Sequence, residues 1–185
     1  MNDYRVNTNY AKALFLLASD TEALEQVHTD MRLVEQVCGE NRELNVVFAN
    51  PTIPSARKQR IVEALFSSHV CEVTMAFLRF VVRKSRAVNL KGISKAFIQM
   101  YRDERGIVLS DLVTHQPIDE TARRMVTQMV ADYTGKNVEL HDRTDVKMLG
   151  GFKLEFDNKM YDARIRTKIR KLRLAFANNE YESKL

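Results

Sequence analysis

Cysteine, proline and glycine are scarce in this sequence, and long apolar runs are missing. The 185 residues include two cysteines, three prolines and six glycines. Two cysteines are too few for a disulfide scaffold, so a reducing compartment is the simpler assumption. No run of about 18 apolar residues exists, which excludes a membrane-spanning helix. The chain starts with an early acid, Asp3, and few arginines, so it fits neither a signal peptide nor a transit peptide.

The motifs of catalysis are also missing. A phosphate-binding loop needs glycines followed by lysine and a hydroxyl, and Thr134-Gly135-Lys136-Asn137 lacks the first glycine and that hydroxyl. The four histidines fall on separate expected elements, and no paired Cys or His stands at metal-ligand spacing. No Gly-x-Ser-x-Gly motif is present, and both cysteines lie in apolar helical patterns that predict inert burial. The sequence therefore predicts no enzyme, no cofactor and no metal site.

What is present is a globular composition in which 45% of the residues are apolar, enough for a core. Up to residue 105, proline, glycine and capping residues divide the chain into short segments with apolar positions at helical spacing. Ser19-Asp20-Thr21-Glu22 predicts a capping box, Gly39 a helix end and Asn89 a helix cap. Six helices joined by short loops predict a bundle. The expected helices are Tyr4 to Ala18, Leu24 to Cys38, Glu40 to Ala49, one opening near Pro54 and reaching Phe66, Cys71 to Arg86, and Asn89 to Arg105.

The pattern changes at Gly106. Ile107 to Thr114 is a β-branched continuous run, Asp119 opens a helix that ends at Thr134-Gly135, and alternating runs surround a tight turn at Asp157-Asn158. Gly150-Gly151 precedes one of these runs and predicts a bulge. We expect a mostly α fold, with an N-terminal six-helix bundle over residues 1–105 and a smaller α+β domain over residues 106–185. One face of the second domain's first helix should carry Ala122, Met125, Val126, Met129, Val130 and Tyr133.

The segment from Arg164 to Arg173 is strongly basic. It holds six Lys or Arg and no acid, whereas the whole chain carries only +5, so the remainder is near neutral. Ile165, Ile169, Leu172 and Phe176 recur at helical spacing, and we expect this stripe to pack on the sheet. The basic face fits solvent, an acidic protein partner or nucleic acid, but no groove-reading motif accompanies it. A basic helical RNA-binding protein is the alternative function, and its binding would weaken steeply with salt.

The first and fifth expected helices are apolar around nearly their whole circumference. The run from Tyr10 to Ala18 has one polar residue, Lys12, and the run from Val73 to Val82 has two polar breaks, Thr74 and Arg79. Either both helices are central in the bundle, or their outer faces form an apolar groove for a partner's amphipathic helix.

Taken together, four stretches resemble the delta subunit family of the bacterial rotary ATP synthase, which is similar to the mitochondrial oligomycin sensitivity-conferring protein. They occur in the family's order, and the resemblance covers essentially the whole chain. The stretches are NYAKALFLLA, NPTIPSARKQRIVEALF, FLRFVVRKSRAVNLKGISKAF and LGGFKLEFDNKMYDARIRTKIRKL.

The resemblance implies a non-catalytic stator subunit that ties the alpha/beta catalytic hexamer of a proton- or sodium-translocating ATP synthase to its peripheral stalk. The subunit would lie at the cytoplasmic face of the bacterial inner membrane, attached indirectly through the complex. The C-terminal domain would meet the end of the b subunit, with Arg166, Arg170 and Arg173 as candidate contacts. The first and fifth helices would receive the N-terminal helix of an alpha subunit on faces that are exposed in the free protein. The implied contacts are Tyr10, Ala13, Leu14, Leu17, Ala76 and Phe80.

One departure from the family concerns the turn before the last helix. The family usually has Asp-Gly-Ser there, whereas this chain has Asp162-Ala163-Arg164. The glycine that supplies a flexible turn and the serine that caps the helix are both replaced. Asp162 is the residue left to cap the helix.

Overall fold

The computed structural model describes residues 2–177 of the chain. The chain divides into two compact units, residues 1–105 and residues 106–185, of which residues 178–185 lie outside the described part. The described residues are mostly helical, and a small four-stranded sheet lies in the second unit. This distribution of helix and strand agrees with the pattern of the sequence.

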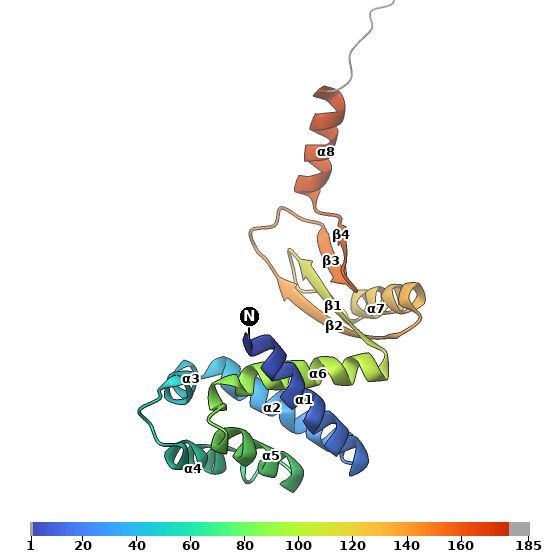
Figure 1. The fold of residues 1–185 in the computed structure, drawn as a ribbon. Helices are drawn as coiled ribbons and strands as arrows, with labels where there is room; N and C mark the ends of the chain where they lie inside the picture. The colour runs from blue at the N-terminus through green and yellow to red at the C-terminus, as the bar shows by residue number, and fades with distance from the viewer. Residues whose placement is uncertain (1, 178–185) are drawn as a thin grey trace, which may run out of the picture. The chain divides into compact units, whose positions relative to one another are not determined.

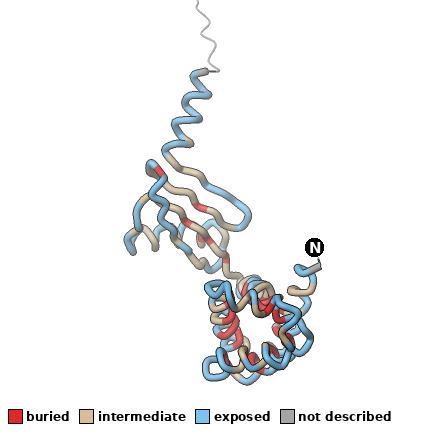
Figure 2. The backbone as a smooth tube through the Cα atoms, turned by 90° about the vertical axis from the view of Figure 1, so that its left-hand side faces the viewer, coloured by how far each residue is buried: buried red, intermediate tan, exposed pale blue. Residues whose placement is uncertain are grey.

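The helices of the first unit pack their apolar faces against one another around a shared core (Figure 1). In Figure 2 the buried segments lie on the inner sides of these helices. The core includes the fully buried side chains of Leu14, Met31, Phe66, Leu78 and Phe97. The described helices are α1 (Asn2–Asp20), α2 (Leu24–Glu40), α3 (Arg42–Ala49), α4 (Ser55–Phe66), α5 (Glu72–Arg83) and α6 (Leu90–Arg105), with a 3-10 turn at Ala87–Asn89.

Three expected helix signals of the first unit are wrong. Glu22 has φ of 54°, and α2 starts at Leu24 without a side-chain cap, so the capping box does not form. Gly39 lies inside α2, which ends at Glu40. Asn89 donates its side-chain amide to Asn7 Oδ1 at 3.0 Å, and its own Oδ1 has no partner, so it does not cap α6. For Glu22 the backbone conformation, and for Asn89 a contact with a residue distant in sequence, replaces the local signal.

Asp30 supplies a cap to α5 from another helix. Its buried carboxylate, on α2, accepts a hydrogen bond at 2.8 Å from the backbone N–H of Cys71, the residue that precedes α5. A carboxylate at a helix N-terminus satisfies a free amide and is favoured by the helix dipole. The contact therefore fixes where α5 begins relative to α2.

The second unit contains β1 (Ile107–Thr114), α7 (Glu120–Thr134), β2 (Asn137–Thr144), β3 (Phe152–Phe156), β4 (Lys159–Asp162) and α8 (Ile165–Ala177). The strand order is β2-β1-β3-β4, with β1 and β2 parallel and the other pairs antiparallel. The helix α7 joins the parallel pair. Its start and end agree with the sequence, because Asp119 accepts from the Ala122 N–H and Gly135 adopts φ of 67°.

A tight turn and a loop containing glycine position the last strands. Asp157 and Asn158 both have positive φ, as a two-residue hairpin turn between β3 and β4 requires. Gly151, with φ of 83°, lies in the loop before β3, and a Cβ there would come within 2.4 Å of the Ala163 carbonyl oxygen. Because β3 begins only at Phe152, the bulge expected at this glycine pair is wrong. The pair instead allows the loop to approach Ala163 and Ile165 closely.

Candidate partner-binding sites

The apolar circumference of α1 is divided between the core and solvent. Ala13 and Leu17 are exposed, Leu17 by 47%, and Tyr10 is half-buried. Leu14 is fully buried between Ala11 and Ala18, so the expectation that its face is exposed in the free protein is wrong. Residues three before and four after Leu14 share its side of the helix, and both belong to the core.

The helix α5 is divided in the same way. Met75, Phe77, Leu78, Val81 and Val82 are buried, whereas Ala76 is exposed and Phe80 is 39% exposed. Thus neither helix is wholly central.

A ring contact joins the exposed parts of α1 and α5. The centroids of Tyr10 and Phe80 lie 6.2 Å apart, and Lys84 Nζ lies 5.7 Å from the Phe80 centroid. The contact connects the two helices into one apolar surface with a cation at its edge. We call Tyr10, Ala13, Leu17, Ala76 and Phe80 the α1–α5 face.

Asp162 organises the turn into α8. Its Oδ1 accepts hydrogen bonds from the Nε and backbone N–H of Arg164 at 2.9 and 3.0 Å, and its Oδ2 accepts from the Thr167 hydroxyl at 3.0 Å. The Arg164 guanidinium, chiefly, and then its backbone N–H and the Thr167 hydroxyl hold the pKa of Asp162 well below its usual range. The backbone N–H that Asp162 accepts from precedes α8, so Asp162 holds the turn through Arg164 and Thr167 and does not cap a backbone N–H of the helix itself.

Beyond its first turn α8 stands away from the sheet, exposed along nearly all of its length (Figures 1 and 2). Ile165, Ile169, Leu172 and Phe176 are 44% to 75% exposed, so the expectation that this stripe packs on the sheet is wrong. The contact of α8 with the domain is local, through the Ile165 N–H and the Gly150 carbonyl. Helical spacing identified the stripe but could not say what covers it.

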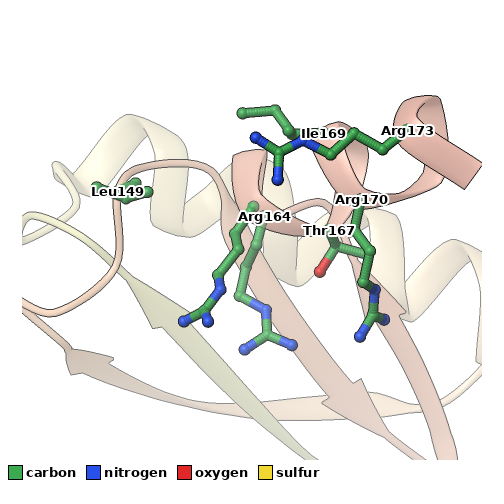
Figure 3. A pocket seen from close by; sticks show the side chains of 7 residues that line it. Leu149, Arg164, Thr167, Ile169, Arg170 and Arg173 are labelled. Atoms are coloured by element: carbon green, nitrogen blue, oxygen red, sulfur yellow. The ribbon is translucent and has the colours of Figure 1, made fainter.

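The basic residues of α8 surround a concavity of about 630 Å³ (Figure 3). Arg166, Arg170 and Arg173 are exposed, and none of them pairs with an acid within residues 2–177. Figure 3 shows Arg164 and Arg170 extending to one side and Arg173 lying beside Ile169. Because the lining also includes Leu149 and Ile169, the surface combines positive charge with apolar area.

A third surface was not predicted from the sequence. Met125, Met129 and Tyr133 of α7 were expected to share one face with Val126 and Val130, but they are 59% to 66% exposed. Met129 and Tyr133 line a pocket of about 380 Å³ beside β3 and β4. The spacing of the α7 stripe gave no signal that these side chains would be exposed, because it is typical of a helix face that packs on a core.

Both thiols are at least partly buried. Burial raises the pKa of the Cys38 thiol to about 11, which makes it a poor nucleophile, while Cys71 is half-buried. Within residues 2–177, no cluster of three or more His, Cys, Asp or Glu could hold a metal ion. None of the described helices is long and apolar enough to cross a membrane.

Comparison with known proteins identifies relatives along nearly the whole chain. A family model described as "ATP synthase delta (OSCP) subunit" matches residues 6–176. An ATP synthase subunit delta of Cytophaga hutchinsonii is 35% identical, over 95% of this chain and 96% of the relative. Its counterpart from Salinibacter ruber is 30% identical, over 91% and 89%.

A solved structure has the same fold. One chain in the cryo-EM structure of the Toxoplasma gondii mitochondrial ATP synthase hexamer matches with a TM-score of 0.70 at 21% identity. The match covers 92% of this chain and 97% of that chain. The likeness extends through both units of the described structure.

Proposed function

The chain belongs to the ATP synthase delta (OSCP) subunit family, and from this premise we propose how its two units divide the work of a stator. It is a structural, non-catalytic subunit and a peripheral part of the membrane-bound complex. We propose that the first unit, as a six-helix bundle, binds the N-terminal helix of an alpha subunit. The second unit then binds the C-terminal end of the b subunit. The subunit then lies at the cytoplasmic face of a bacterial inner membrane, attached to it through the complex.

The observation that carries this proposal is that each unit has an exposed surface suited to a protein partner. The α1–α5 face offers an aliphatic and an aromatic side chain, Leu17 and Phe80, beside the small residues Ala13 and Ala76. Small residues let a partner helix approach closely while the larger side chains serve as anchors. The exposed arginines of α8 suit an acidic segment of a stalk protein.

Aspartate at Leu17 or Phe80 should weaken binding of the alpha subunit's N-terminal peptide by about 30-fold or more, because a buried anchor contributes about 2 kcal/mol. Isothermal titration calorimetry with the full chain measures this change. Val46→Asp, at a 60% exposed position on α3, is the matched control and should bind as the wild type does.

Circular dichroism separates loss of binding from loss of fold. Leu17→Asp and Phe80→Asp should keep wild-type helicity, whereas Leu14→Asp should unfold the bundle because Leu14 is fully buried. Normal peptide binding by the Leu17 and Phe80 variants would contradict the proposed contact.

Charge reversal on α8 tests the other partner. Arg166→Glu combined with Arg170→Glu should weaken binding to the C-terminal segment of the b subunit by about tenfold or more, because like charges replace attraction. The charge-matched control is Arg124→Glu with Lys136→Glu, two exposed positions of the same unit. Binding of the alpha-subunit peptide should not change. An equal loss of both partners would show that the units do not divide the work.

A further inference from the structure

The chain around α8 lacks counter-charges of its own. The stretch from Ala163 to Asn179 includes six Lys or Arg and no aspartate or glutamate. Of these bases, Arg164 alone pairs with an acid within residues 2–177, and that acid is Asp162, which precedes the helix. Like charges one turn apart on a helix repel each other. The helix therefore carries a repulsion that an acidic segment laid along it would relieve.

The helix also receives little support from packing. Beyond its first turn it is exposed along nearly all of its length. Its bounds are Ile165–Ala177, and an isolated helix shorter than about 12–15 residues is marginal in water. Leu149 and Ile169, the apolar side chains of the concavity in Figure 3, are exposed as well. A segment that covered this side would therefore stabilise α8 through charge and through apolar contact.

The next acids along the chain follow α8 directly. We call residues 178–185, which lie outside the described part, the post-α8 segment. It opens with Asn178-Asn179 and then carries two acids, Glu180 and Glu182, and one base, Lys184. Asparagine is frequent just after helices and in turns because it tolerates left-handed backbone. The sequence thus combines a signal for chain reversal with two carboxylates at alternate positions.

The two glutamates are near enough along the chain to reach the arginines. An extended chain advances about 3.4 Å per residue, so Glu180 and Glu182 can lie up to about 10 Å and 17 Å from Ala177. A helix rises about 1.5 Å per residue, which puts Arg173 about 6 Å and Arg170 about 10 Å before Ala177. Alternate residues of an extended chain point to the same side. A chain that reverses after α8 can therefore present both carboxylates to these two guanidinium groups.

The tether favours the post-α8 segment over a second molecule as the occupant. A segment joined by a few residues acts at an effective concentration of about millimolar, whereas a second copy must associate from dilute solution. Ion pairs at an exposed surface are individually weak, so such a contact forms and breaks readily. A partner with more acidic groups can therefore displace the segment.

We propose that the post-α8 segment binds back along α8 in the free subunit and covers its arginines until an acidic partner displaces it. Glu180 pairs with Arg173, and Glu182 pairs with Arg170. The role of this contact rests on the proposed function in one respect, that the C-terminal end of the b subunit is the partner that displaces the segment. The cover then restricts the α8 surface to partners whose charges compete with the chain's own acids.

The first test observes the arginine side chains of the full chain, free of any partner, by NMR. Glu180→Gln combined with Glu182→Gln should shift the Nε–Hε signals of Arg170 and Arg173, because neutral amides replace the carboxylates that face them. Both substitutions keep the size of the side chain, so a shift reports the loss of charge.

The second test measures binding to the C-terminal segment of the b subunit by calorimetry. The same double variant should bind about threefold more tightly, which corresponds to a cover that is in place about two-thirds of the time. The charge-matched control is Glu43→Gln with Glu104→Gln, two exposed acids of the first unit. The control should keep the wild-type affinity and the wild-type arginine signals.

The outcomes separate this inference from the proposed function. Shifted arginine signals together with tighter binding support the inference. Unshifted signals overturn it, and the stalk assignment still stands if Arg166→Glu with Arg170→Glu loses binding to the b subunit. Shifted signals with unchanged affinity overturn the role as a displaceable cover. A shift that disappears when the protein is diluted would identify α8 of a second copy as the binding site and overturn the intramolecular contact.

Discussion

At the scale of single residues, Asp162 shows how one side chain can hold a turn. Its carboxylate accepts hydrogen bonds from the side chain and backbone of Arg164 and from Thr167, and these bonds hold its pKa below the usual range. The turn before α8 therefore depends on the ionised form of Asp162.

The pH dependence of this turn follows from the sign of the shift. Because the folded-state pKa is depressed, the stabilisation by Asp162 is complete above the unfolded value of about 3.9 and is lost as the pH falls toward the folded value. Carboxyl NMR titration should find Asp162 protonating at lower pH than an ordinary aspartate, and Arg164→Gln should raise its pKa. A normal pKa in the wild type would contradict the hydrogen-bond network.

Some features of single residues could be predicted from the sequence, and others could not. Asp119 and Gly135 were predicted as the ends of α7 because capping and left-handed backbone depend on the residue's own chemistry. The burial of Leu14 could not be predicted, because helical spacing does not set the angle at which a helix meets its neighbours. Leu17, on the same helix, was correctly expected to be exposed.

At the scale of elements, α5 depends on α2 for its first turn. The Asp30 carboxylate accepts from the Cys71 N–H, and α5 in turn presents Ala76 and Phe80 to solvent. A sequence pattern reveals caps close in sequence, but this cap is contributed from 41 residues away. The same limit applies to the pocket that Met129 and Tyr133 line beside β3 and β4, which is built from segments distant in sequence.

Asp30→Ala should lower the free energy of unfolding by about 1–3 kcal/mol, because it leaves a partly buried amide without its acceptor. Asp30→Asn keeps an acceptor oxygen and should cost less. Urea denaturation of the full chain measures both changes. Asp20→Ala, at an exposed position that makes no cap, serves as the control. Equal losses in the two Asp30 variants would show that the negative charge, and not the hydrogen bond, is what stabilises α5.

At the scale of the whole molecule, the last turn of α6 is held to α2 by contacts that lie entirely within the first unit. The Tyr101 hydroxyl donates to Glu25 Oε2 at 2.6 Å, and Arg105 forms an ion pair with the same carboxylate. The hydrogen bond from Tyr101, first, and the charge of Arg105 lower the pKa of Glu25. Gly106 follows directly with φ of 59°, which ends the helix. The contacts that hold α6 to α2 are thus complete within residues 1–105.

A fragment of residues 1–105 should therefore fold by itself, giving mostly helical circular dichroism and one cooperative thermal transition. Its shared apolar core lies wholly within this range, and the Glu25 contacts close it at the C-terminal end. A fragment of residues 1–100, which lacks Tyr101 and Arg105, should melt at a lower temperature although it keeps Phe97 and nearly all of the core. If the two fragments melted together, the Glu25 contacts would be unimportant for α6. If the longer fragment stayed unfolded, the first unit would require the second for its stability.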